Sequence, residues 1–162
     1  MNTSRLEVFD TTLQKTAVWL KEIMVELGSK DRHLAYLALR ATLHALRDRL
    51  TVEEAVHLGA QLPMLIRGFY YEGWTLSLRP SKAHKAGFLS SIRDCFGPGI
   101  PPDPERVARA VFKVLAHHVT SGEIKDVKQL LPKDLRDLWS EHLGSGEQVA
   151  RAHSARLNGD GS

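Results

Sequence analysis

Two short acidic motifs in the sequence have a spacing that could bind a metal ion. Glu54 and His57 show the Glu-x-x-His spacing of helical di-iron proteins, and Glu123 and Asp126 repeat that spacing later in the chain. Such a site needs two of these motifs and two further glutamates on other helices, all directed inward. Each glutamate, however, follows a threonine by three residues, the spacing of a helix-capping box. We therefore interpret both glutamates as caps on the protein surface and expect no metal ion and no other cofactor.

Cys95 is the only cysteine of the chain and is therefore the candidate nucleophile. No histidine lies at a local spacing that would pair with its thiol, and the patterns of a nucleophile elbow or a phosphate-binding glycine loop do not occur. A lone cysteine within a helix is usually a passive small residue. The sequence therefore predicts no catalytic residue, and we expect this protein not to be an enzyme.

Basic residues recur at helical spacing along two long predicted helices. They are Arg40, His44 and Arg47 on the first helix, and Arg106, Arg109, Lys113 and His117 on the second. Two such faces could bind the phosphates of a nucleic acid or another polyanion. The formal net charge is only +3, and charged helix faces are usually solvated, so polyanion binding is the alternative hypothesis.

An aromatic cluster near the middle of the chain comprises Phe69, Tyr70, Tyr71 and Trp74. Tyrosine and tryptophan are enriched at protein interfaces because they combine a large apolar area with a polar tip. We favour packing of these rings at the junction between two halves of the chain, and contact with a partner is the other interpretation. The leading functional hypothesis is a non-catalytic protein-interaction module, with an unknown protein or a second copy of the chain as partner.

Arg67 precedes this cluster and follows a Leu-Pro pair by four residues, as Arg136 does in the second half of the chain. A residue that recurs beside the same Leu-Pro pair is explained by local structure better than by a single ligand site. We expect both guanidinium groups to bond helix-end carbonyls or a nearby carboxylate.

The elements that position these residues come in two similar sets. A shift of 69 positions aligns residues 19–70 with 88–139 without a gap, and it gives eleven identities. Apolar spacing predicts helices over residues 9–27, ending at Gly28, and over residues 31–50. The predicted fold is all-α: a roughly four-helix unit, duplicated in tandem (about 8–74 and 85–143) and packed as one pseudo-twofold helical bundle over residues 1–143. Residues 144–162 lack apolar periodicity and are expected to be disordered.

The composition agrees with one soluble domain. Of the 162 residues, 43% are hydrophobic and 25% are charged, and the single cysteine gives no disulfide framework. No apolar run reaches the length of a signal peptide core or of a membrane span. We therefore expect a cytoplasmic protein without a membrane partner.

One long stretch, "ALRATLHALRDRLTVEEAVHLGAQLPMLIRGFYYEGW", resembles the bacterial family called domain of unknown function 2267. The resemblance lies in a leucine-rich helix with "LRDRL", an "EEA" turn, "AQLP", and "RG" followed by aromatic residues and a tryptophan. It covers about residues 8–142 and implies an all-helical fold. It supplies no activity and no functional residues. The second half lacks the "RGFYYEGW" aromatics, so a function of that cluster would belong to the first half alone.

Overall fold

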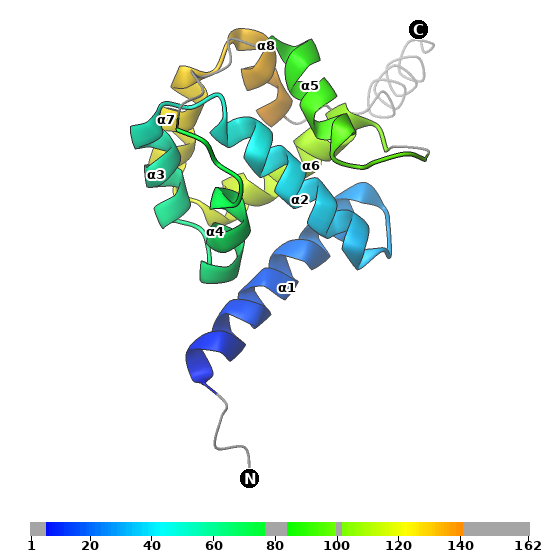
Figure 1. Ribbon diagram of the computed structural model, residues 1–162, viewed down its shortest axis with the longest axis vertical. Coiled ribbons are helices and arrows are strands. Elements are labelled where there is room, and N and C mark those ends of the chain that lie inside the picture. The colour runs from blue at the N-terminus through cyan, green and yellow to red at the C-terminus, as the bar shows by residue number, and fades with distance from the viewer. Residues whose placement is uncertain (1–5, 77–83, 100–101, 141–162) are drawn as a thin grey trace, which may run out of the picture.

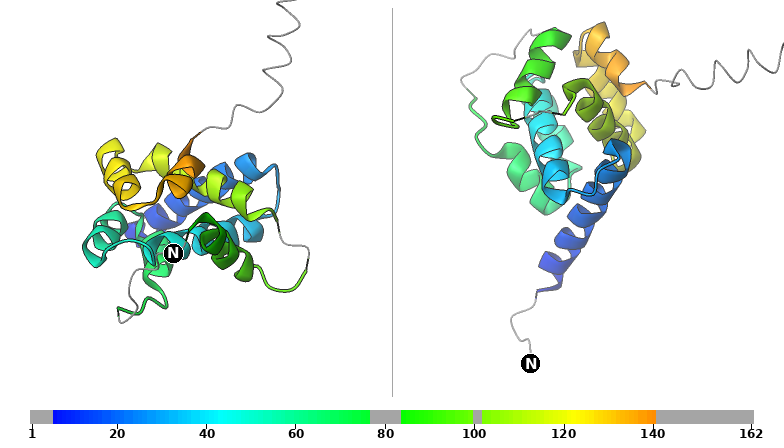
Figure 2. Two further views of the ribbon diagram at one scale, coloured as in Figure 1. Left: turned by 90° about the horizontal axis from the view of Figure 1, so that it is seen from above. Right: turned by 90° about the vertical axis from the view of Figure 1, so that its right-hand side faces the viewer.

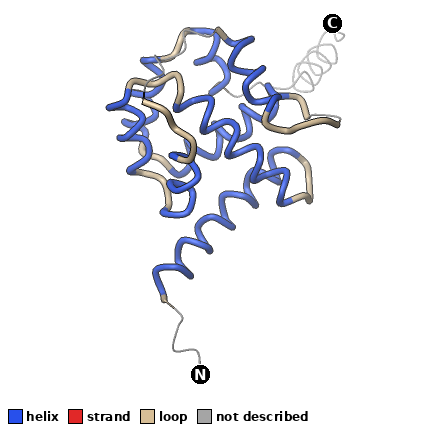
Figure 3. Tube along the Cα trace, viewed as in Figure 1, coloured by secondary structure: helices blue, strands red, loops and turns tan. Residues whose placement is uncertain are grey.

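The computed structural model describes residues 6–76, 84–99 and 102–140, and in these ranges the protein is all-helical, as predicted (Figures 1 and 3). The expected disordered tail and most of the connecting loop lie outside the described residues. The helices, in chain order, are α1 (Glu7–Leu27), α2 (Arg32–Arg47), α3 (Val52–Ala60), α4 (Met64–Tyr71), α5 (Lys85–Asp94), α6 (Pro104–His118), α7 (Ser121–Leu130) and α8 (Lys133–Arg136), followed by a 3-10 turn (Asp137–Trp139).

Helix α1 is longer than the body that it packs against. Its apolar stripe buries Leu20, Ile23 and Leu27 in the core, but Phe9 and Leu13 of the same stripe are exposed. These side chains are exposed because the N-terminal part of α1 extends beyond the other helices, as two perpendicular views show (Figures 1 and 2). The helix ends at Gly28, as predicted, where a φ of 61° suits a residue without a Cβ.

Helices α2 and α6 form the centre of the bundle. Each buries residues around much of its circumference, and α2 packs against α1, α4, α5 and α6. The predicted start of α6 is confirmed: the Asp103 side chain accepts a hydrogen bond from the Glu105 N–H, and Pro104 occupies the first turn. Buried side chains from both halves, among them Leu39, Tyr70, Phe88 and Phe112, belong to one hydrophobic core.

Two pairs of short helices begin at positions that differ by 69 residues. Helix α3 begins at Val52 and α7 at Ser121 (121 − 52 = 69), while α4 begins at Met64 and α8 at Lys133 (133 − 64 = 69). In the first pair, a threonine caps each helix, as predicted. Thr51 Oγ1 accepts a hydrogen bond from the Glu54 N–H at the start of α3, and Thr120 Oγ1 accepts one from the Glu123 N–H at the start of α7. The second pair differs in length, since α4 has eight residues and α8 has four.

Among the described residues, no helix combines the length and apolar character that crossing a bilayer requires.

Candidate functional site

The aromatic cluster lies mostly inside the protein. Tyr70 is fully buried, and its hydroxyl donates a hydrogen bond of 2.7 Å to the Ala55 carbonyl. Phe69, Tyr71 and Trp74 are half-buried and pack against the core. Phe69 contacts Tyr36 edge to face, and Tyr71 stacks on Trp74 with ring centroids 5.6 Å apart. The cluster thus packs α4 onto its neighbours and offers little free surface.

The basic residues of α2 do not form one exposed stripe. Arg47 is only 5% exposed, and its guanidinium donates to the carbonyls of Tyr70 and Glu72 and to the carboxylate of Asp48. The His44 ring forms a 2.6 Å hydrogen bond with the Phe69 carbonyl, and burial lowers the pKa of that ring. Arg40 reaches Glu72 at 3.7 Å. The helical spacing that suggested a solvated face instead places Arg47 and His44 beside the carbonyls at the end of α4.

The basic residues of α6 lie along a cleft of about 620 Å³, together with acidic residues. Arg106 donates to the Leu27 carbonyl at the end of α1, and Lys113 pairs with Glu26 at 3.1 Å. Arg109 donates to Glu105 and to the carbonyls of Asp137 and Ser140. The three cations share this cleft with Glu26, Asp103 and Glu105, so opposite charges balance there.

Arg67 has the structural role that its position predicted. Its guanidinium donates to the carbonyls of Gly59, Ala60 and Leu62, which lie at and beyond the end of α3. Arg136, which follows Arg67 by 69 positions, is exposed and makes no corresponding contact in the described part of the chain. Helix α7 runs to Leu130, one residue further than α3 after the 69-residue shift, so the chain after it turns differently.

The two capping glutamates lie against each other where α3 packs on α7. Carboxylate oxygens of Glu54, Glu123 and Asp126 all lie within 4.8 Å of one another, and Glu123 is 8% exposed. The prediction of a surface cap is therefore wrong for Glu123, because packing of α7 on α3 covers its side chain. Its carboxylate does not reach back to the Thr120 N–H, which donates to Gln61 instead at 3.0 Å.

Burial and the neighbouring Glu54 raise the pKa of Glu123 to about 7. The Oε1 atoms of Glu54 and Glu123 are both buried without a hydrogen-bond partner, and two carboxyl groups can bond to each other only when one of them carries a proton. His57 lies 4.0 Å from Glu54 on its exposed side. The arrangement allows the two carboxyl groups to share a proton, and it favours the protonated form of Glu123.

Cys95 is surface-exposed, and its thiol donates to the Ser91 carbonyl at 3.4 Å. Partial burial of the sulfur raises the pKa of the thiol, which disfavours the nucleophilic thiolate.

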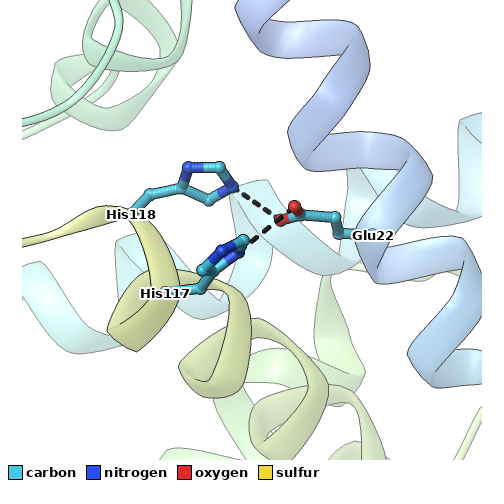
Figure 4. A group of neighbouring side chains, drawn as sticks. All are labelled: Glu22, His117 and His118. Carbon is cyan, nitrogen blue, oxygen red and sulfur yellow. Dashed lines mark hydrogen bonds and ion pairs between the residues drawn. The ribbon is translucent and has the colours of Figure 1, made fainter.

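A second cluster joins α1 to the end of α6, two helices that are far apart in the sequence. The sequence pattern did not reveal this cluster. Glu22 of α1 meets His117 and His118, the last two residues of α6 (Figure 4). Glu22 Oε1 lies 3.2 Å from His117 Nδ1, and Glu22 Oε2 lies 2.6 Å from His118 Nε2. The adjacent histidines are visible in the sequence, but Glu22 is 95 or 96 residues away and only the packing of α1 on α6 brings it there.

The N-terminal apolar patch is a third surface feature of interest. We use this name for Leu6, which directly precedes α1, Phe9 and Leu13 of the protruding part of α1, and Met64 and Leu65 of α4. These five side chains are 41–56% exposed. The Leu65 N–H donates to Thr12 Oγ1 at 2.9 Å, so the start of α4 lies against the same turn of α1.

Comparison with known proteins defines the family of the chain. The family model of the uncharacterized conserved protein DUF2267 (domain of unknown function 2267) matches residues 16–138. The chain belongs to this family. A search of the curated proteins found no match.

Proposed function

We propose that this protein is a helical module that acts by binding another polypeptide rather than by catalysis, and that its partner is a second copy of the same chain. The observation that carries the proposal is the N-terminal apolar patch, since α1 projects beyond the core and exposes large apolar side chains. Groups of exposed large apolar side chains often mark protein interaction sites. The patch replaces the aromatic cluster as the expected contact surface.

Self-association fits the composition and size of the patch. Leu6, Phe9 and Leu13 continue the alternating three- and four-residue spacing of the α1 stripe, which suits pairing of like helices. Most homo-oligomers are twofold dimers in which both copies use the same surface. The five side chains are each 41–56% exposed, so a twofold contact through the patch would cover apolar surface on both copies.

The experiment is analytical ultracentrifugation across a range of protein concentrations. The wild type is expected to show a concentration-dependent monomer–dimer equilibrium, and Phe9→Glu should shift it to monomer because a charge would be buried in the contact. Val25→Glu is the matched control, since Val25 is exposed on α1 outside the patch. Tyr71→Ala tests the aromatic cluster as the contact instead. A wild type that stays monomeric, or a dimer that survives Phe9→Glu, would refute the proposal.

We also propose that the two halves arose by duplication of one helical unit. The matched starts of α3 with α7 and of α4 with α8, and the contact between the equivalent residues Glu54 and Glu123, support this idea. A duplicated unit should superpose on its copy after a shift of 69 positions, and failure of the Cα traces to overlay would contradict it.

Polyanion binding, the alternative hypothesis, receives no comparable support. Its candidate residues Arg47, Arg106 and Arg109 donate to backbone carbonyls, and acidic residues share the cleft along α6.

A further inference from the structure

The cluster formed by Glu22, His117 and His118 has the composition of a metal centre. One carboxylate and two imidazoles are the protein ligands of many catalytic zinc sites and of non-haem iron sites. Their ligand atoms all lie within 4.8 Å of one another and come from two helices. Both histidine rings face the Glu22 carboxylate (Figure 4).

The distances fit an ion of the first transition series. A tetrahedral zinc ion with bonds of about 2.0–2.2 Å holds its ligand atoms about 3.4 Å apart. Glu22 and His117 are already at 3.2 Å, and the 2.6 Å contact between Glu22 and His118 must widen by less than about 1 Å, which small side-chain rotations provide. In a neutral imidazole either ring nitrogen can carry the lone pair, depending on the tautomer. The nitrogens that face Glu22 can therefore change from hydrogen-bond donors to metal ligands.

The surroundings orient the ligands and favour a cation. The His118 ring stacks on Trp19, with centroids 4.8 Å apart and an interplanar angle of 16°, which fixes the direction of its Nε2. Trp19 is itself buried in the core. Both histidines end α6, and the carbonyls at the C-terminus of a helix carry partial negative charge. His117 is exposed, which leaves room for water or a further ligand.

We propose that Glu22, His117 and His118 bind a divalent transition-metal ion such as Zn²⁺, which cross-links α1 to the end of α6. This departs from the expectation of a metal-free protein, since that expectation considered only the motifs of Glu54 with His57 and of Glu123 with Asp126. The inference does not depend on self-association, because none of the three residues belongs to the N-terminal apolar patch.

Isothermal titration of chelator-treated protein with ZnCl₂ tests this site, and the absorption spectrum of the Co²⁺ form reports its geometry. The wild type should bind one ion per chain. Glu22→Gln and His117→Ala should each weaken Zn²⁺ binding more than about tenfold. Even the loss of a residue that only orients a ligand lowers metal affinity by about ten- to a hundredfold. His117 is the decisive position, because its exposed ring can be removed without disturbing the stacking on Trp19.

Matched controls separate this site from other histidines. His33→Ala removes an exposed histidine of α2, and a His142→Ala, His153→Ala double variant removes two that lie outside the described residues. All should bind Zn²⁺ as the wild type does, and so should Phe9→Glu, so failure of the proposed dimer would leave this result intact. In the presence of chelator, Glu22→Gln and His117→Ala should melt as the wild type does. Binding that is unchanged in both of these variants, or absent in the wild type, would overturn the inference.

Discussion

At the scale of single residues, the carboxyl pair of Glu54 and Glu123 governs how stability depends on pH. The folded protein raises the pKa of Glu123 from an ordinary value of 4.5 to about 7, because burial and the neighbouring Glu54 disfavour its charge. The fold therefore favours the protonated carboxyl over the charged form. Stability from this residue is present in full below pH 4.5 and is lost as the pH rises through 7.

Glu123→Gln should remove this pH dependence. Glutamine is uncharged at every pH and can donate a hydrogen bond to Glu54, so the variant should be more stable than the wild type at pH 8 by about 1–3 kcal/mol. The two proteins should differ little near pH 4.5. Urea denaturation between pH 5 and 8 provides the measurement, and Glu53→Gln, an exposed change on α3, is the control. Parallel pH profiles for wild type and Glu123→Gln would show that the pair does not share a proton.

At the scale of elements, arginine side chains hold helix ends together. Arg67 covers the carbonyls at the end of α3, Arg47 joins α2 to the end of α4, and Arg106 joins α6 to the end of α1. Each guanidinium supplies several donors in a fixed plane, which suits carbonyls that have no partner within their own helix. The recurrence of arginine in this chain therefore reflects the short helices and the many helix ends that they create.

Arg67→Ala and Arg136→Ala should have unequal effects, although both residues follow a Leu-Pro pair by four residues. For Arg67→Ala, loss of three charge-assisted bonds to carbonyls, two of them partly buried, should lower the free energy of unfolding by about 1–2 kcal/mol. The exposed Arg136 should change it by less than about 0.5 kcal/mol. Chemical denaturation at one pH compares the two directly. Equal losses would mean that Arg136 has a structural role that its exposed position does not reveal.

At the scale of the whole molecule, one hydrophobic core receives side chains from both halves. Ile23 and Leu39 of the first half and Phe88 and Leu115 of the second are buried in the same core. Neither half can bury its apolar surface alone in this arrangement, since α2 packs against α5 and α6 as well as against α1. The protein should therefore unfold as one cooperative unit.

Calorimetry on the Phe9→Glu variant, expected to be monomeric, tests this cooperativity. A single transition with equal calorimetric and van't Hoff enthalpies is expected, because loss of either half exposes the core of the other. Two resolved transitions, or a calorimetric enthalpy about twice the van't Hoff value, would indicate two independently folding halves.

Local patterns in the sequence determined most of the helices and several of their ends, although α2 ends at Arg47 and not at residue 50 as predicted. The all-helical fold, the end of α1 at Gly28, the threonine caps of α3 and α7, and the start of α6 at Asp103 and Pro104 each depend on residues only a few positions apart. Such signals act within one or two helical turns, so they survive any change in tertiary packing. The structural role of Arg67 could be predicted for the same reason, because its acceptors lie within eight residues.

Only the tertiary structure decided which faces of these helices meet. The helical spacing that relates Arg47 to Arg40 and His44 is the same whether that face of α2 is solvated or covered. In the folded protein the end of α4 covers Arg47. The stripe of α1 continues through Phe9 and Leu13 although the core ends before them. Glu54 meets Glu123, and Glu22 meets His117, across 69 and 95 residues of chain. Contacts of that separation depend on how whole helices pack, and the spacing of residues along one helix does not encode them.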